Sequence, residues 1–304
     1  MTGSARDRDT DMDVAADIFL GYRELLFSVV YTMLGTVADT EDVLQEVWLA
    51  WIRRAGGSGA APIDNPRAYL TRMAVNHALV RREALSRRRE EYIGQWLPEP
   101  LVAASGDEGP DAVLRAEAFS MAVMVVLESL TPLERAVFVL NEVFGYRHTE
   151  IAEMLDRAPA AVRQIAHRAR EHVQARRPRT RAHPRECREV TERFVVAAMG
   201  GDIEELLAVL APDVTLWTDG GDKGPRTSLR PVRGAPAVAE LFANIARRGL
   251  AGVQVRRRTV SGDPGAVVFS GGSPLAVIVL DIAADRTVTG IYSVTNPDKL
   301  GYIA

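Results

Sequence analysis

The stretch LTPLERAVFVLNEVFGYRHTEIAEMLDRAPAAVRQIAHRAREHV, residues 130–173, contains two helix starts and a tight turn. Thr131 is followed by a proline and then, three residues after itself, by Glu134, which is the capping-box pattern of a helix start. Gly145 can adopt the left-handed backbone that ends a helix. The sequence therefore predicts a helix over residues 132–144.

The second half of this stretch predicts a helix-turn-helix. A short helix over 149–155 is followed by a turn at 156–158, and a proline opens a longer arginine-rich helix over 160–176. In such a motif the second helix enters the major groove of DNA. Residues at helical spacing would pack inward: Val162, Ile165, Ala166 and Ala169. The opposite face would contact DNA through Arg163, Gln164, His167, Arg168 and Arg170. A helical hairpin with a solvated basic face is the alternative.

Residues 14–93 are predicted to be all helical, after a polar N-terminus over 1–13 that we expect to be disordered. Apolar residues recur every three to four positions in the first helix, and an Asn–Pro pair at 65–66 starts the third. This third helix runs to about residue 89. Its exposed face is expected to carry Arg72, Asn76, Arg81 and Arg82.

The rest of the chain divides into a linker, a second helical block and an α+β domain. Residues 94–112, GQWLPEPLVAASGDEGPDA, contain prolines, glycines and acids and read as a linker. The second helical block, 113–178, begins with a helix over 113–129. Beyond residue 185, helices at 186–199, 202–210 and 235–247 precede valine-rich runs, which predict strands at 253–260, 266–270, 275–281 and 287–295.

Composition excludes several classes of protein. The single cysteine, Cys187, rules out an intramolecular disulfide and a CxxC zinc site, so we expect no metal and no cofactor. The first residues form no signal peptide, and the longest apolar run, 121–127, is too short to span a bilayer. These features predict a cytoplasmic protein without a membrane partner. The net charge is −3, but arginines crowd residues 81–89 and 163–188, where contact with DNA phosphates would occur.

The helical blocks resemble two domains of the extracytoplasmic-function sigma factors of bacterial RNA polymerase. Residues 130–173 are similar to that family's promoter −35-binding domain, and NPRAYLTRMAVNHALVRR (65–82) to its −10-reading helix, in which Asn76 matches the family's asparagine. Val80 departs from the family pattern, and so does Arg82. YTMLGTVADTEDVLQEVWLAWIRR (31–54) resembles the clamp-binding segment, with matches at Asp39, Glu41, Asp42, Gln45, Glu46 and Trp48.

This resemblance implies a function and a set of partners. The chain would direct core RNA polymerase, through its β′ clamp and β flap, to specific promoters, and it would be no enzyme. The −10 element would be held by Arg72, Asn76, Arg81 and Arg82. Capturing an unstacked base costs a few kcal/mol, and short polar side chains flanked by arginines suit that task. We expect a monomer when the protein is free of polymerase.

Residues 185–304 resemble the SnoaL-like, NTF2-like α+β domain that one group of these sigma factors carries, a cone with a curved antiparallel sheet. Three motifs carry this resemblance: WLPEPL at 96–101, DGGDK at 219–223, where Asp222 replaces a glycine, and NPDKL at 296–300. The chain's only two lysines lie in the last two motifs. The implied regulatory residues are Trp96, Leu97, Pro98, Asp219, Gly220, Gly221, Lys223, Asn296, Pro297, Asp298, Lys299 and Leu300. The alternative is that these motifs are only turns.

Three other functions remain alternatives. The C-terminal domain could be an enzyme, but no histidine follows His183, and its aspartates show no obvious pairing for acid–base chemistry. It could hold a small-molecule ligand against Phe194, Trp217 and Phe242, which could equally fill a core. A stand-alone helix-turn-helix repressor would leave residues 14–93 without a role.

Overall fold

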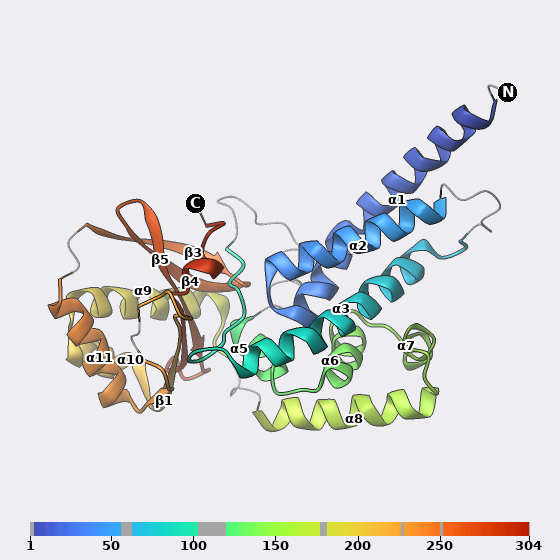
Figure 1. Cartoon of the computed structure of the whole chain (residues 1–304). Coiled ribbons are helices and arrows are strands. Elements are labelled where there is room, and N and C mark those ends of the chain that lie inside the picture. Colours follow the sequence, from blue (N-terminus) through green and yellow to red (C-terminus); the bar gives the residue numbers. More distant parts are fainter. Residues whose placement is uncertain are drawn as a thin grey trace. The chain divides into compact units, whose positions relative to one another are not determined.

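The computed structural model describes residues 3–55, 63–102, 120–176, 181–225, 228–249 and 252–303 (Figure 1). The chain forms two compact units. Unit 1 comprises Met1–Arg88 and Leu127–Ala175, and unit 2 comprises Arg89–Val126 and Arg176–Ala304. Linker positions 103–112 and the start of the expected helix over 113–129 lie outside the described residues. The described part of that helix is α5 (Met121–Leu127).

The first three helices of unit 1 are α1 (Gly3–Leu34), α2 (Val37–Ala55) and α3 (Pro66–Glu90). Because α1 begins at Gly3, the expected disorder over 1–13 is wrong. The reason is that no proline or glycine interrupts the sequence between Gly3 and Gly21, so a helix nucleated by its buried second half can extend toward the N-terminus. Asn65 accepts a hydrogen bond from the backbone of Ala68, which confirms the predicted cap of α3.

The helix-turn-helix has the predicted form. α6 (Pro132–Phe138) begins with the Thr131–Glu134 capping box and continues as a π-helix, η1 (Val139–Val143). α7 (His148–Leu155) ends at Asp156 in the left-handed conformation (φ 51°), and α8 (Pro159–Arg176) follows the turn.

The two helical blocks of unit 1 share one hydrophobic core, in which side chains of α1–α3 pack with side chains of α6–α8. Two polar contacts join the blocks. Arg135 of α6 is fully buried and donates to the carbonyl of Thr32 at 2.7 Å. The hydroxyls of Thr71 in α3 and Tyr146 lie 3.1 Å apart. The blocks that the sequence suggests as separate domains are therefore packed as one body, because the apolar faces of both are needed to complete the core.

Unit 2 contains a six-stranded sheet in the order β2-β1-β6-β5-β4-β3. Its strands are β1 (Leu210–Asp219), β2 (Val232–Arg233), β3 (Val253–Val260), β4 (Asp263–Ser270), β5 (Ser273–Ile282) and β6 (Val288–Val294). The antiparallel meander β3–β6 confirms the four predicted strands. β1 was not predicted; it pairs parallel to β6, with a register shift between Leu210 and Thr215.

The two faces of this sheet pack against different partners. One face packs against α9 (Pro184–Gly200), α10 (Ile203–Val209) and α11 (Ala235–Arg247). The other face packs against Leu97 of the linker, Met121 of α5 and the C-terminal residues around η2 (Pro297–Lys299). This arrangement fits the expected α+β domain and brings the WLPEPL and NPDKL motifs to the same face.

Candidate functional sites

The outer face of α8 presents most of the predicted −35-binding residues. Arg163, Gln164, His167 and Arg168 are exposed, while the four residues predicted to pack inward are buried, as expected. Arg170 is only partly exposed, because its guanidinium donates to Glu142 of η1 at 2.5 Å. α8 therefore offers two arginines, a glutamine and a histidine for DNA, with Arg170 holding the helix to η1.

A shallow groove of about 320 Å³ runs along α1 and α2, on unit 1. Four of the predicted polymerase-binding residues line it: Glu41, Asp42, Gln45 and Trp48. The Trp48 ring packs on the ring of Phe19 with centroids 5.0 Å apart. The groove thus combines an aromatic floor with a charged rim, on which Arg23 pairs with Glu41.

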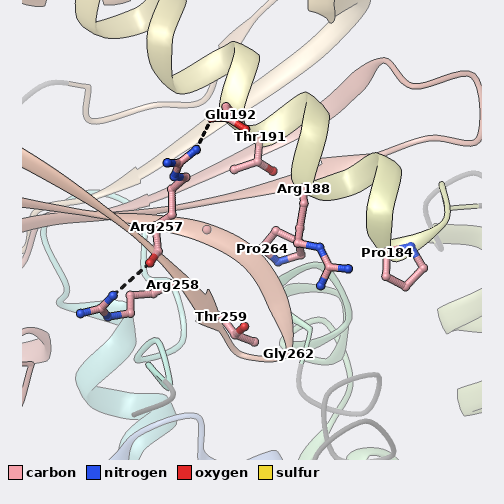
Figure 2. Close-up of a pocket in the computed structure, with 10 residues that line it drawn as sticks. Pro184, Arg188, Thr191, Glu192, Arg257, Arg258, Thr259, Gly262 and Pro264 are labelled. Carbon is pink, nitrogen blue, oxygen red and sulfur yellow. Dashed lines mark hydrogen bonds and ion pairs between the residues drawn. The ribbon is translucent and has the colours of Figure 1, made fainter. Parts of the chain in front are cut away.

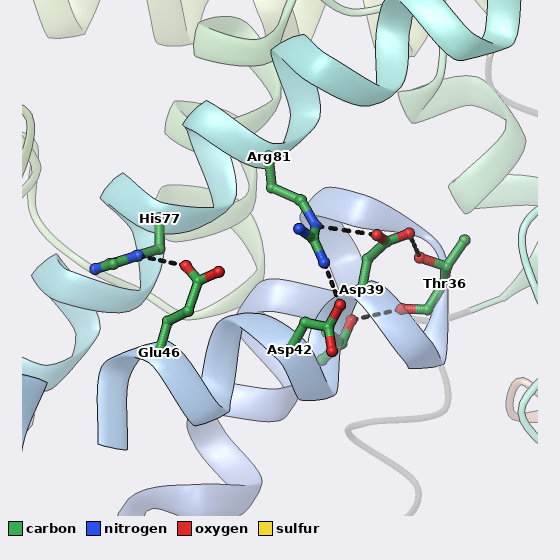
Figure 3. Close-up of polar contacts among 7 residues, drawn as sticks. Thr36, Asp39, Asp42, Glu46, His77 and Arg81 are labelled. Atoms are coloured by element: carbon green, nitrogen blue, oxygen red, sulfur yellow. Dashed lines mark hydrogen bonds and ion pairs between the residues drawn. The ribbon is translucent and has the colours of Figure 1, made fainter. Parts of the chain in front are cut away.

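Three acidic residues of α2, including Asp42 of the groove, contact side chains of α3 (Figure 3). Asp39 accepts from Arg81 at 3.0 Å, and Asp42 pairs with the same guanidinium. Glu46 contacts His77 at 2.8 Å. Members of the predicted polymerase-binding and −10-binding sets are therefore paired with each other across the two helices.

The predicted −10 face of α3 is only partly as expected. Arg72 and Asn76 are exposed, and Asn76 lines a second shallow groove, of about 470 Å³, with His77, Val80 and Arg81 among its neighbours. The exposure predicted for Arg82 is wrong. Its side chain is only 4% exposed, and it donates to the carbonyl of Met33 and to Glu128, because α3 turns this position toward the shared core.

In unit 2, Asp219 at the end of β1 joins the linker to the C-terminal motif. Its carboxylate is fully buried and lies 2.7 Å from the Lys299 ammonium. The same oxygen accepts from the backbone N–H of Leu97 at 2.8 Å, and the other oxygen accepts from the Tyr92 hydroxyl at 2.5 Å. A buried carboxylate needs such partners to remain charged.

Lys299 completes the same cluster. Its ammonium donates to the carbonyl of Leu97 and lies 4.1 Å from the centre of the Trp96 ring, a cation–π distance. Asn296 donates to the Tyr92 hydroxyl at 2.7 Å. Burial and the neighbouring Asp219 raise the pKa of Tyr92. We call the residues of this cluster the linker clasp: Tyr92, Trp96, Leu97, Asp219, Asn296 and Lys299.

A second, exposed pair lies between the same two motifs. Lys223 contacts both oxygens of Asp298 at 2.9 Å, and both side chains are about 60% exposed. The glycines allow this approach. Gly221 has φ 58°, and a Cβ there would lie 2.7 Å from Asn296. Asp222 is exposed, so its replacement of a glycine meets no obstacle.

The remaining predicted regulatory residues surround the clasp. Gly220 packs closely against Pro225 and Thr295. Pro98 and Leu300 are buried, whereas Pro297 is exposed. Tyr92 was not predicted from the sequence; it lies just after the end of α3. The signal was its position four residues before WLPEPL, where an aromatic residue can fold back on the motif.

The three aromatic residues considered for a ligand site pack into the cores of the C-terminal domain. Phe194 and Phe242 pack edge to face within the core, and Trp217 stacks on Tyr292. Two more aspartates lie near one arginine: Arg181 lies 2.6 Å from Asp263 and 3.7 Å from Asp281.

Burial raises the pKa of Asp263 to about 6, although Arg181 counteracts the shift. Among the described residues, no group of three or more candidate metal ligands occurs. In the same part of the chain, no helix has the length and apolarity that crossing a membrane requires.

The comparisons with known proteins agree with this architecture. The family described as Sigma-70 region 2 matches residues 18–89, and Sigma-70 region 4 matches residues 120–173. The chain therefore carries the two promoter-directed regions of a sigma-70 factor.

Relatives match over nearly the whole chain. ECF RNA polymerase sigma factor SigJ of Mycobacterium tuberculosis is 37% identical over 92% of this chain and 91% of its own length. A probable ECF sigma factor of the same organism, SigI, is 28% identical over 95% of both chains. The crystal structure of SigJ superposes with a TM-score of 0.73 at 34% identity, over 94% of this chain and 98% of that one.

The chain belongs to the extracytoplasmic-function RNA polymerase sigma factors. It is a non-enzymatic transcription initiation factor that acts with core RNA polymerase on promoter DNA, and it carries an α+β domain after region 4.

Proposed function

We propose that the C-terminal domain restrains this sigma factor by holding the linker between regions 2 and 4 in the linker clasp. The observation that carries the proposal is the Asp219–Lys299 pair, which binds both the N–H and the carbonyl of Leu97. Holding one residue by its donor and its acceptor fixes the backbone, whereas side-chain contacts alone would let it slide.

Initiation requires regions 2 and 4 to separate. The −10 and −35 elements are about 25 base pairs apart, which is about 85 Å along a duplex with a rise of 3.4 Å per base pair. In unit 1 the two regions share a core through contacts such as Thr71–Tyr146. Binding both elements therefore needs this core to open, and opening needs a linker that is free to extend.

Within the open form, we assign the surfaces as follows. Arg163, Gln164, His167 and Arg168 read the −35 element, and Arg170 supports them from its pair with Glu142. Arg72 and Asn76 serve the −10 element, with Arg81 joining them once it leaves Asp39. The groove beside Trp48 receives the β′ clamp, and region 4 receives the β flap. We further propose that the protein acts in the cytoplasm and is a monomer when it is free of polymerase.

Run-off transcription with purified core polymerase on a genomic fragment library tests this function. We expect the chain to confer start sites that share −10 and −35 sequences. Removing residues 185–304 should raise the transcript yield from those sites several-fold, because the linker loses its holder. An unchanged yield would contradict the restraint, and an absence of start-site selection would contradict the assignment of the promoter surfaces.

A further inference from the structure

A cavity of about 430 Å³ lies in unit 2 between α9 and the turn that joins β3 to β4 (Figure 2). Its size is that of a small-ligand site. Arg188 and Thr191 line it from α9, and Arg257 and Thr259 line it from β3. It is separate from the aromatic core around Phe194 that the sequence first suggested as a ligand site.

The charges around this cavity favour an anion. Arg257 is paired with Glu192, and Arg258 donates to the backbone carbonyl of Arg257. Arg188 is exposed, and none of the described residues forms an ion pair or a hydrogen bond with it. The Arg188 guanidinium is thus available to a ligand. Glu192 carries the only carboxylate among the residues lining the cavity, and it is already paired with Arg257.

A buried hydroxyl beside this cavity has no hydrogen-bond partner among the described residues. Thr191 is only 3% exposed, and its Oγ1 makes no hydrogen bond with any described residue. A threonine within a helix usually donates to the carbonyl one turn earlier, so an unbonded buried hydroxyl is costly. A ligand oxygen in the cavity would satisfy it. Pro184 and Pro264 add apolar walls.

We propose that this cavity binds a small organic oxyanion, a phosphate or carboxylate attached to a compact apolar group. The oxyanion would take its charge-assisted hydrogen bonds from Arg188 and accept the hydroxyl hydrogen of Thr191, while the apolar part would lie between the two prolines.

The turn beside the cavity also holds the linker. Ser261 donates its N–H to the carbonyl of Leu101 at 2.6 Å, and its hydroxyl accepts from the Leu101 N–H at 3.1 Å. Thr259 and Gly262, on either side of this contact, line the cavity. A bound ligand would therefore stiffen the turn and strengthen the hold on the linker. This second step rests on the proposed restraint of transcription.

Calorimetry with phenyl phosphate, using benzyl alcohol as the neutral control, tests the site on the full-length chain. Phenyl phosphate should bind and benzyl alcohol should not. Arg188→Ala should weaken binding at least about tenfold, and Thr191→Val at least about threefold. Arg193→Ala is the matched control, because this arginine of the same helix pairs with Glu205 and does not line the cavity.

Two results would overturn the site: equal affinity for phenyl phosphate and benzyl alcohol, or equal losses in Arg188→Ala and Arg193→Ala. Loss of binding to an unrelated DNA duplex in Arg188→Ala, without any phenyl phosphate binding, would instead identify a DNA phosphate contact. Phenyl phosphate should also lower run-off transcription by wild type but not by Arg188→Ala. If phenyl phosphate binds but transcription is unchanged, the site is supported and its proposed effect on transcription is contradicted. If the proposed restraint of the linker is wrong, transcription will differ from the prediction while ligand binding will not.

Discussion

Lys299 and Asp219 form a buried ion pair between residues 80 positions apart, with the ammonium 2.7 Å from the carboxylate and side-chain exposures of 8% and 0%. The same two side chains bind both backbone groups of Leu97. The pair therefore connects the last motif of the chain, the end of β1 and the linker through one set of contacts.

Breaking this pair should destabilise unit 2. In Lys299→Met the stem remains but Asp219 is left buried without its counter-ion, which costs about 3–5 kcal/mol. Urea unfolding of the full chain measures the loss. Lys223→Met, which removes one member of the neighbouring, exposed Lys223–Asp298 pair, should leave the unfolding curve unchanged. Identical unfolding curves for the two variants would show that the buried Asp219–Lys299 pair does not stabilise unit 2.

Arg168 should act in base recognition. Arg168→Ala is expected to cost about 1–3 kcal/mol in binding to a −35 element, because the residue is exposed on the outer face of α8. Arg168→Lys keeps the charge but not the planar fork, so it should recover non-specific binding but not sequence preference. Binding to a set of single-base −35 variants is the measurement. An identical preference profile for Arg168→Ala and wild type would contradict the role.

Substitutions at Arg82 and Arg72 should have different effects: the first on the stability of the fold, the second on DNA binding. Arg82→Ala leaves Glu128 with one arginine fewer and opens a gap beside Met33, so we expect a loss of about 3 kcal/mol or more in stability. Arg72→Ala, at an exposed position of the same helix, should reduce use of the −10 element at an unchanged melting temperature. If Arg82→Ala instead reduced use of the −10 element at unchanged stability, and Arg72→Ala lowered stability, Arg82 would have to be assigned to the DNA-binding face.

Asp263 predicts a pH dependence of stability. Its pKa is raised from 3.8 to about 6 in the folded chain, chiefly by burial, so the folded state binds more protons than the unfolded state between these values. Its contribution therefore favours folding below about pH 4 and is lost as the pH rises through 6. Relative to Asp263→Asn, wild type should lose roughly 2–3 kcal/mol between pH 4 and pH 7.

Urea unfolding at intervals across this pH range measures the effect, with Glu204→Gln, at an exposed position of the same unit, as the control. A difference between wild type and Asp263→Asn that stays constant, or that grows in favour of wild type with pH, would show that Arg181 outweighs the effect of burial.

Local signals in the sequence predicted much of the fold. The Thr131–Glu134 capping box, the cap at Asn65 and the turn at Asp156 each act within a few residues, so their structure follows from neighbouring side chains. The runs of β3–β6 were recognisable because they are rich in valine and other apolar residues and are separated by turn residues. β1 escaped prediction because Pro212 and Asp213 interrupt its alternation where the strand shifts register against β6.

Long-range contacts were less predictable. The three motifs of the clasp could be found in the sequence, but their meeting depends on a linker that packs on the sheet and on β1 pairing with β6. Arg82 looked like another surface arginine because its burial depends on Glu128, which lies 46 residues away. The cavity beside Thr191 could not be predicted from the sequence, because α9 and β3 are far apart in the chain and come together only in the folded domain.

Promoter-specific run-off transcription by wild type, Lys299→Met and Lys223→Met, each with the same purified core polymerase, tests the restraint most directly. The account predicts that Lys299→Met yields at least about threefold more transcript than wild type, since releasing the linker lowers the free energy of opening. Lys223→Met should match wild type. Equal yields from all three proteins, at equal occupancy of the polymerase, would contradict the claim that the clasp limits initiation.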